Sequence, residues 1–337
     1  MTMTATTVAS EHQTMQRGRA LVKWFANSAT AGPLVALLIA IAVFALSTDT
    51  FFTVDNGSLV VQQMLVTGTL AMGQTLVILT AGIDLANAAV MVLGTLVIAK
   101  LASGGGMPGL LALAVGVVLC TALGGLSGTL VTRLKLPPFI VTLGVLSVLT
   151  AVSQLYANGE SFPVTSSALT WLGERSYLFG QIEVTVGMTV MIVLTAAVWF
   201  ALTQTSWGRN VYAVGDDEEA ARLSGVNTKR VILSVYLLAG FIYAIAAWQA
   251  LGRIPNADPN AFQLGNLESI TAVVIGGTSL FGGRGGIPGT ILGALVVTVL
   301  ANGLTQAGID SLYQQVATGI LVIVAVALDR LVRGRAT

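Results

Sequence analysis

The chain has 337 residues, of which 55% are hydrophobic and only 9% are charged, and its formal net charge is +1. Soluble domains carry about 25% charged residues, so the composition excludes a water-soluble globular protein and predicts a polytopic membrane protein. The near-zero net charge gives no reason to expect nucleic acid as a partner. A single cysteine, Cys120, excludes an internal disulfide and a cysteine-based metal cluster.

Residues 1–29 are polar and rich in Thr, with basic residues ahead of the first apolar run. We interpret them as an uncleaved cytoplasmic tail. A membrane-spanning helix needs about 20 mostly apolar residues. Ten segments of residues 30–330 approach this pattern, and a second cytoplasmic tail follows at 331–337. The ten segments are 30–47, 58–81, 85–102, 109–131, 138–156, 184–204, 229–251, 266–281, 287–303 and 313–330.

The distribution of basic residues tests this count, because cytoplasmic loops are enriched in Lys and Arg. With the N-terminus in the cytoplasm, thirteen of the sixteen Lys and Arg residues fall in cytoplasmic segments. Only Lys100, Arg175 and Arg253 fall on the outer side. We therefore expect an all-α membrane protein with about ten transmembrane helices and both termini in the cytoplasm.

Two pairs of glycines predict close helix packing. Gly124 and Gly128 are four residues apart, and so are Gly289 and Gly293. Small residues at this spacing let helix backbones approach each other in lipid. Because one pair falls in each half of the chain, we also hypothesise a duplicated helix bundle, which is a common plan in transporters.

Four acidic residues are adjacent in the stretch "GDDEEAARLSGV", residues 215–226. On the topology above they lie in the longest cytoplasmic loop, 205–228. We expect a helix of about eight residues here, with Asp216 as N-cap, Glu219 as its capping-box partner and Gly225 as the stop signal. The helix either enters a groove on another protein or is a solvated connection between two spans.

The longer stretch "GRNVYAVGDDEEAARLSGVNTKRVILSVYLLAG" resembles the cytoplasmic coupling loop of ribose-type permease subunits of ATP-binding-cassette (ABC) importers. Here Asp replaces the Asn of the family pattern, and one extra residue precedes the Ala pair. The stretches "QTLVILTAGIDL", "KLPPFIVTLGVLSV" and "LESITAVVIGGTSLFGGRGGIPGTILGALVVTVLANGL" resemble three further family signatures. Together these matches cover most of residues 60–330.

This resemblance implies the membrane permease subunit of an ABC importer that translocates a monosaccharide, a pentose or hexose, across the bacterial plasma membrane. It implies a fold like that of the type II importer permeases, embedded in membrane lipid. It also implies three partners: a separate cytoplasmic ATPase subunit, an extracytoplasmic sugar-binding protein, and a second permease in a homodimer or paired assembly. The positions expected to couple to the ATPase are Gly215, Asp216, Glu219, Ala220, Ala221, Ser224 and Gly225.

The chain has no G-x-x-x-x-G-K-[ST] motif, which cradles nucleotide phosphates in ATPases. We therefore expect ATP and Mg²⁺ on the partner ATPase, no cofactor bound by this chain, and no enzymatic activity of its own. Its only histidine, His12, lies in the N-terminal tail, which argues against a catalytic triad. No metal-ligand spacing appears either.

Polar residues inside the spans are candidates for the translocation path or for helix packing. An acid at bilayer depth must be paired, interfacial or beside water, and we favour a structural, capping role for Asp84, in "GIDLANA". Glu268 lies near the outer end of its expected span. The candidates are Asp84, Asn87, Gln74, Glu268 and Asn302.

Two other transporter classes remain as alternatives. An ion-coupled secondary transporter would usually carry several intramembrane charges, and this chain offers few. An ABC permease for branched-chain amino acids would share the architecture.

Overall fold

The computed structural model describes residues 30–178, 182–310, 312–320, 323 and 327. The expected tails, 1–29 and 331–337, lie outside the described residues. Of the expected tenth span, residues 312–320 are helical, and most of the remainder is not described.

Within the described residues, nine helices correspond to the first nine expected spans, and the prediction of an all-α membrane protein is confirmed. They are α2 (Ala31–Ser47), α3 (Val54–Leu79), α4 (Asn87–Ser103), α5 (Gly109–Leu134), α6 (Pro138–Ala157), α8 (Val186–Gln204), α11 (Thr228–Arg253), α12 (Gly265–Ile275) and α13 (Ile287–Gln306). Five of these, α5, α6, α8, α11 and α13, are long and apolar enough to cross a membrane. The helices α2, α4 and α12 are shorter but also apolar.

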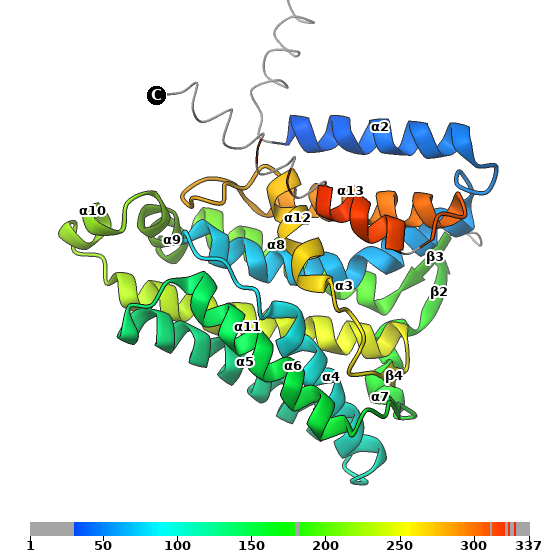
Figure 1. Ribbon diagram of the computed structural model, residues 1–337, viewed down its shortest axis with the longest axis horizontal. Helices are drawn as coiled ribbons and strands as arrows, with labels where there is room; N and C mark the ends of the chain where they lie inside the picture. The colour runs from blue at the N-terminus through cyan, green and yellow to red at the C-terminus, as the bar shows by residue number, and fades with distance from the viewer. Residues whose placement is uncertain (1–29, 179–181, 311, 321–322, 324–326, 328–337) are drawn as a thin grey trace, which may run out of the picture.

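The helices run roughly along one axis, with distinct structures at the two ends (Figure 1). One end carries two short helices, α9 (Ser206–Asp216) and α10 (Glu218–Leu223). The other end carries α7 (Ser167–Thr170), a 3-10 turn (Trp171–Gly173) and two antiparallel strand pairs. Strand β1 (Phe162–Pro163) pairs with β4 (Asn256–Ala257), and β2 (Arg175–Leu178) pairs with β3 (Ile182–Thr185).

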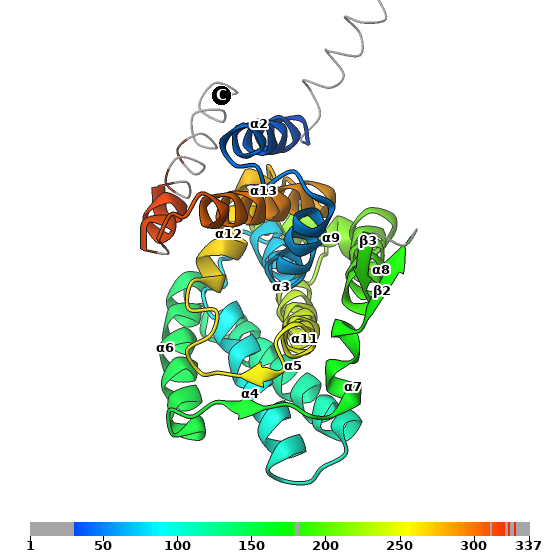
Figure 2. The ribbon, with the colours of Figure 1, turned by 90° about the vertical axis from the view of Figure 1, so that its right-hand side faces the viewer.

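Helix α3 lies in the interior, packed against α11, α12 and α13. Figure 2 looks along the bundle and shows α3 and α11 between the outer helices. Consecutive residues of α3 from Met64 to Val66 and from Gly68 to Leu79 are buried on every face of the helix. Because protein rather than lipid surrounds it, α3 accommodates Gln74 and several hydroxyl side chains at membrane depth.

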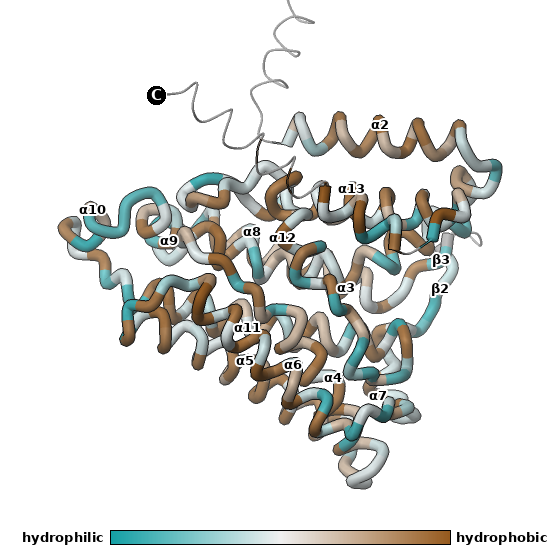
Figure 3. Tube along the Cα trace, viewed as in Figure 1, coloured by the Kyte–Doolittle hydropathy of each residue, from teal (hydrophilic) through white to brown (hydrophobic). Residues whose placement is uncertain are grey.

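The outer helices are rich in hydrophobic residues (Figure 3), and many of their apolar side chains are exposed. On α6, Phe139, Ile140 and Leu143 are about half exposed, and on α5 Val118 is 69% exposed. Exposed apolar surface of this extent is stable only against lipid or a partner subunit. It is the surface that the prediction of a membrane protein requires.

The two glycine pairs lie at helix–helix contacts. Gly124 and Gly128 of α5 face α11, where a side-chain carbon on Gly124 would overlap the Tyr236 carbonyl oxygen. Gly289 and Gly293 of α13 face α12 in the same manner. The absence of a side chain lets the two backbones approach in each case. Whether the two halves of the chain are duplicates stays a prediction.

Helix α12 is shorter than the expected span 266–281. It has 11 residues, or about 16 Å at 1.5 Å per residue, which is roughly half the bilayer core. Residues 276–286 then form an irregular turn, because Gly277, Gly282, Gly283 and Gly285 adopt positive φ values that end the helix. The backbone before α12 is likewise irregular.

Candidate functional site

The expected cytoplasmic loop 205–228 is mostly helical. Helix α9 occupies Ser206–Asp216, and the Thr205 side chain caps it by accepting a hydrogen bond from the Gly208 amide at 3.2 Å. The sequence analysis missed α9, because its apolar residues are too few to resemble a span. A single residue, Asp217, separates α9 from α10.

The N-cap of α10 is Asp217, so the expectation of Asp216 was wrong. Asp217 Oδ1 accepts hydrogen bonds from the amides of Glu219 (2.9 Å) and Ala220 (3.0 Å). Asp216 instead ends α9, the helix that the sequence analysis missed. Helix α10 therefore has six residues rather than about eight.

Glu219 also differs from its expected capping-box role. Its carboxylate accepts hydrogen bonds from Arg222, with Nε at 3.1 Å, and forms an ion pair with the same guanidinium. This hydrogen bond lowers the pKa of Glu219 below its usual value. Both side chains are exposed, so the ion pair lies on the outward surface of α10 and not on its buried side.

The C-terminus of α10 ends as the sequence predicts, at Gly225. This glycine has φ 87°, and its amide donates to the Arg222 carbonyl at 3.0 Å. The Val226 amide donates to the Ala221 carbonyl at 3.1 Å. These two bonds form a Schellman motif, which requires a left-handed residue at this position.

The two central alanines of α10 face in different directions. Ala221 is 5% exposed and belongs to the protein's own core, whereas Ala220 is exposed. The sequence analysis missed Leu223, which is 78% exposed on the same helix. The sequence did contain a signal for it, because Leu223 is a single large apolar residue beside a run of charged residues. The outward surface of α10 is therefore small and apolar at Ala220 and Leu223, beside the Glu219–Arg222 pair.

Helix α9 is attached to the interior of the bundle through Gly215. A side-chain carbon at this position would overlap the Leu79 carbonyl oxygen at the end of α3. The same carbonyl accepts a hydrogen bond from the Gly283 amide at 3.1 Å. Tyr212 of α9 donates its hydroxyl to the Gly285 carbonyl at 2.9 Å. Three segments thus meet at one point: α9, the end of α3 and the 276–286 turn.

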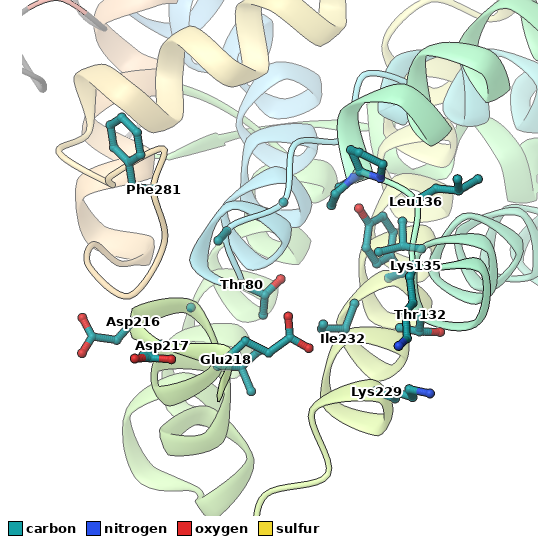
Figure 4. A pocket seen from close by; sticks show the side chains of 18 residues that line it. Thr80, Thr132, Lys135, Leu136, Asp216, Asp217, Glu218, Lys229, Ile232 and Phe281 are labelled. Atoms are coloured by element: carbon teal, nitrogen blue, oxygen red, sulfur yellow. The ribbon is translucent and has the colours of Figure 1, made fainter. Parts of the chain in front are cut away.

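A cavity of about 620 Å³ opens beside this junction. Figure 4 shows Asp216, Asp217 and Glu218 on one side of it, and Lys135 and Lys229 on the other. The cavity separates the α9–α10 segment from the ends of α5 and α11. It leaves room for this segment to move relative to those helices.

Three polar candidates form a connected group in the interior. Asp84 is 2% exposed. Its carboxylate accepts hydrogen bonds from the Ala86 amide (2.9 Å) and from the Tyr243 hydroxyl (3.0 Å). Gln74, in the amide orientation that pairs both of its polar atoms, donates to the Asp84 carbonyl at 2.9 Å and accepts from its amide at 3.2 Å. Asn87 Nδ2 lies 3.2 Å from the Gln74 side chain.

The expectation that Asp84 caps the helix that follows was wrong, because the N-cap of α4 is Ala86 and no side chain caps that helix. The bond from the Ala86 amide to Asp84 forms a turn just before α4 instead. Asn87 Nδ2 also donates to Ser269 Oγ of α12 at 2.7 Å. The group therefore joins α3, α4, α11 and α12. Whether the group is structural or lines the translocation path stays a prediction.

The remaining two polar candidates lie apart from this group. Glu268 is half-buried in the first turn of α12, and Thr67 Oγ1 of α3 donates to its Oε2 at 3.3 Å. Thr67 is near the middle of α3, so Glu268 lies closer to mid-depth than expected. Asn302 on α13 is 4% exposed, and its Oδ1 has no hydrogen-bond partner among the described residues.

A protein-family model described as branched-chain amino acid transport system / permease component matches residues 58–326. This chain belongs to that family. The matched range contains the α9–α10 segment, the α3 junction and the 276–286 turn, so the site described above lies wholly within the family's common part. As a permease component, the chain is a membrane transport subunit rather than an enzyme.

The permease is similar over most of its length to three characterised relatives. It is 42% identical to a fructose import permease protein of Rhizobium meliloti, over 91% of this chain and 87% of the relative. It is 36% identical to the ribose import permease protein of Escherichia coli K12, over 88% of this chain and 92% of the relative. A D-allose transport system permease protein of the same strain is 34% identical, over 89% of this chain and 91% of the relative.

Proposed function

We propose that the permease is the membrane subunit of an ATP-driven importer for a monosaccharide, powered by a separate ATPase subunit. The relatives named for fructose, ribose and allose import support the sugar class, because they match nearly the full length of the chain. The observation that carries the ATP-driven mechanism is the α9–α10 segment, which presents an apolar surface outward and is attached directly to α3.

In this mechanism the outward surface of α10 docks on the ATPase. Ala220 and Leu223 provide the contact, with Glu219 and Arg222 at its rim. Ala221, Ser224 and Gly225 maintain the shape of α10: Ala221 packs inward, Ser224 Oγ donates to the Ala220 carbonyl at 2.9 Å, and Gly225 ends the helix.

Displacement of α10 then reaches the spans through α9. Asp217 connects the two helices, and Gly215 and Asp216 rest against the end of α3 and the Gly282–Gly283 turn. Main-chain atoms contact one another here, so no flexible side chain absorbs the movement. Closure of the ATPase around ATP would thereby move α3, an interior helix of the bundle. ATP and Mg²⁺ belong to that ATPase, and this chain binds neither.

The same proposal orients the permease in the bacterial plasma membrane. The α9–α10 end faces the cytoplasm, where Arg209, Arg222, Lys229 and Arg230 satisfy the positive-inside rule. The strand-bearing end faces outward and receives a sugar-loaded binding protein. Two permeases pair to enclose the path, and lipid covers the other apolar helix faces.

Uptake by proteoliposomes tests the proposal. The permease is reconstituted with an ABC ATPase subunit and a sugar-binding protein, with ATP inside or outside the vesicle. We expect ATP-dependent accumulation of at least one of D-fructose, D-ribose and D-allose, without dependence on an ion gradient. Accumulation of L-leucine alone would favour the amino-acid permease, and gradient-driven uptake without ATP would favour the secondary transporter.

A further inference from the structure

A second cavity, of about 560 Å³, lies between α4, α6 and the segment 259–266 that precedes α12. Its volume is within the roughly 300–1,000 Å³ of small-molecule sites. The described residues that line it include no charged side chain but many hydroxyls and amides. The polar side chains that matter here are Ser147, Thr150, Ser153, Gln154, Asn260 and Asn266.

Ser153 belongs to the wall of this cavity but does not open into it. The residue is 1% exposed, and its hydroxyl oxygen is buried without a hydrogen-bond partner in the part of the chain that the structure describes. A polar group inside the cavity does not reach that oxygen, so recognition of a ligand depends on the side chains that border the open volume.

Gln154 and Asn260 add a matched donor and acceptor. Gln154 Nε2 of α6 donates to Asn260 Oδ1 at 2.8 Å, which connects the two walls of the cavity. This bond leaves Gln154 Oε1 and Asn260 Nδ2 unused among the described residues. A sugar hydroxyl both donates and accepts, so neighbouring hydroxyls on one ring can satisfy both atoms.

The backbone of the third wall is also irregular. Residues 258–264 are not in a regular helix, and they lead from the strand-bearing end to the start of the half-length helix α12. Within a bilayer, irregular backbone is tolerated only where it is enclosed by protein or lines a watery cavity. Interrupted helices near the midplane also form the substrate sites of other transporters.

Phe262 lies on this irregular segment with φ 55° and lines the cavity. A left-handed conformation is rare for a bulky residue, and here it holds an aromatic side chain at the wall of a polar cavity. The C–H face of a sugar ring packs against an aromatic face, while the hydroxyls at its edge meet the amides and hydroxyls opposite.

We propose that this cavity is the binding site for a monosaccharide on its way through the permease, with Gln154 and Asn260 as hydrogen-bonding residues and Phe262 as the stacking surface. The inference rests on the proposed function and adds the place and the chemistry of recognition. An uncharged, hydroxyl-rich ring fits this lining, whereas an α-amino acid brings two charges that the cavity has no side chain to pair.

Protection of an introduced cysteine tests the site in the assembled complex with its ATPase and binding protein. Ala151 lines the cavity, whereas Val148 is 60% exposed on the same helix and is not part of the lining. Both are changed to Cys, one at a time, in a Cys120→Ala background. A water-soluble methanethiosulfonate is then applied with or without the sugar that the wild-type complex accumulates.

We expect that saturating sugar slows labelling of Ala151→Cys at least tenfold and does not change labelling of Val148→Cys, and that L-leucine protects neither. We also expect Gln154→Ala to raise the KM for uptake severalfold, while the loaded binding protein still stimulates ATP hydrolysis. Unprotected or absent labelling of Ala151→Cys in a complex that accumulates sugar would overturn the site alone. A wild-type complex that accumulates no sugar would overturn the proposed function, and this inference with it.

Discussion

Gly215 of α9 and Leu79 of α3 are in direct main-chain contact, although 136 positions of sequence numbering separate them. The Leu79 carbonyl occupies the space where a side chain on Gly215 would begin, and it also accepts the Gly283 amide at 3.1 Å. The segment exposed for docking is thus attached to an interior helix of the bundle. This contact makes α9 a rigid connection between the surface and the interior.

Gly215→Ala should therefore impair coupling. The added methyl group would overlap the main chain of Leu79 and Gly283, and neither can rotate away. Overpacking of this kind typically costs about 1–3 kcal/mol. We expect at least a tenfold loss of ATP-dependent uptake, with the ATPase still bound to α10. Gly144→Ala on α6 is the control, since no atom lies within 4 Å of its added carbon. Unchanged uptake by Gly215→Ala would remove this contact from the mechanism.

Leu223→Ser should weaken docking of the ATPase without unfolding the permease. Leu223 is 78% exposed, so its replacement removes no internal packing. Burial of a Leu side chain at an interface contributes about 1.5–3 kcal/mol, which corresponds to a tenfold or greater loss of affinity. Co-purification of the ATPase in gentle detergent measures the effect. Leu134→Ser, at the exposed end of α5, is a matched control. Equal recovery of the ATPase from both variants would contradict the docking surface.

Asp217→Ala and Asp216→Ala distinguish the observed cap of α10 from the one expected from sequence. Loss of an N-cap side chain costs about 1 kcal/mol. The Asp217 carboxylate accepts from the amides of Glu219 and Ala220. We expect faster hydrogen exchange at these two amides in Asp217→Ala, and nearly unchanged exchange in Asp216→Ala. The reverse order would restore Asp216 as the cap.

Tyr243→Phe and Tyr236→Phe form a second matched pair, because both tyrosines are buried on α11. The Tyr243 hydroxyl donates to the Asp84 carboxylate, whereas the Tyr236 hydroxyl has no partner among the described residues. Removing a donor from a buried carboxylate costs about 1–3 kcal/mol. We expect Tyr243→Phe to lower the unfolding temperature in detergent and Tyr236→Phe to leave it nearly unchanged. Equal effects would show that Asp84 does not depend on Tyr243.

The class of protein and the position of most helices could be predicted from the chain alone, because both depend on local hydropathy and length. Apolar runs of about 20 residues predicted the spans, and Gly225 predicted the end of α10 from its conformational freedom alone. The acidic block also identified the segment that the proposed function assigns to coupling. Each of these signals lies within a short stretch of neighbouring residues.

Which side chains face one another depends on packing between elements that are distant in the sequence. Asp217 rather than Asp216 caps α10 because α9 runs to Asp216, where the neighbouring Gly215 packs against α3. Ala221 faces inward and Ala220 outward because the rotation of a six-residue helix is fixed by its contacts and not by its composition. The cavity beside Ser153 is lined by residues that lie about a hundred positions apart in the sequence. No pattern among neighbouring residues could therefore predict it.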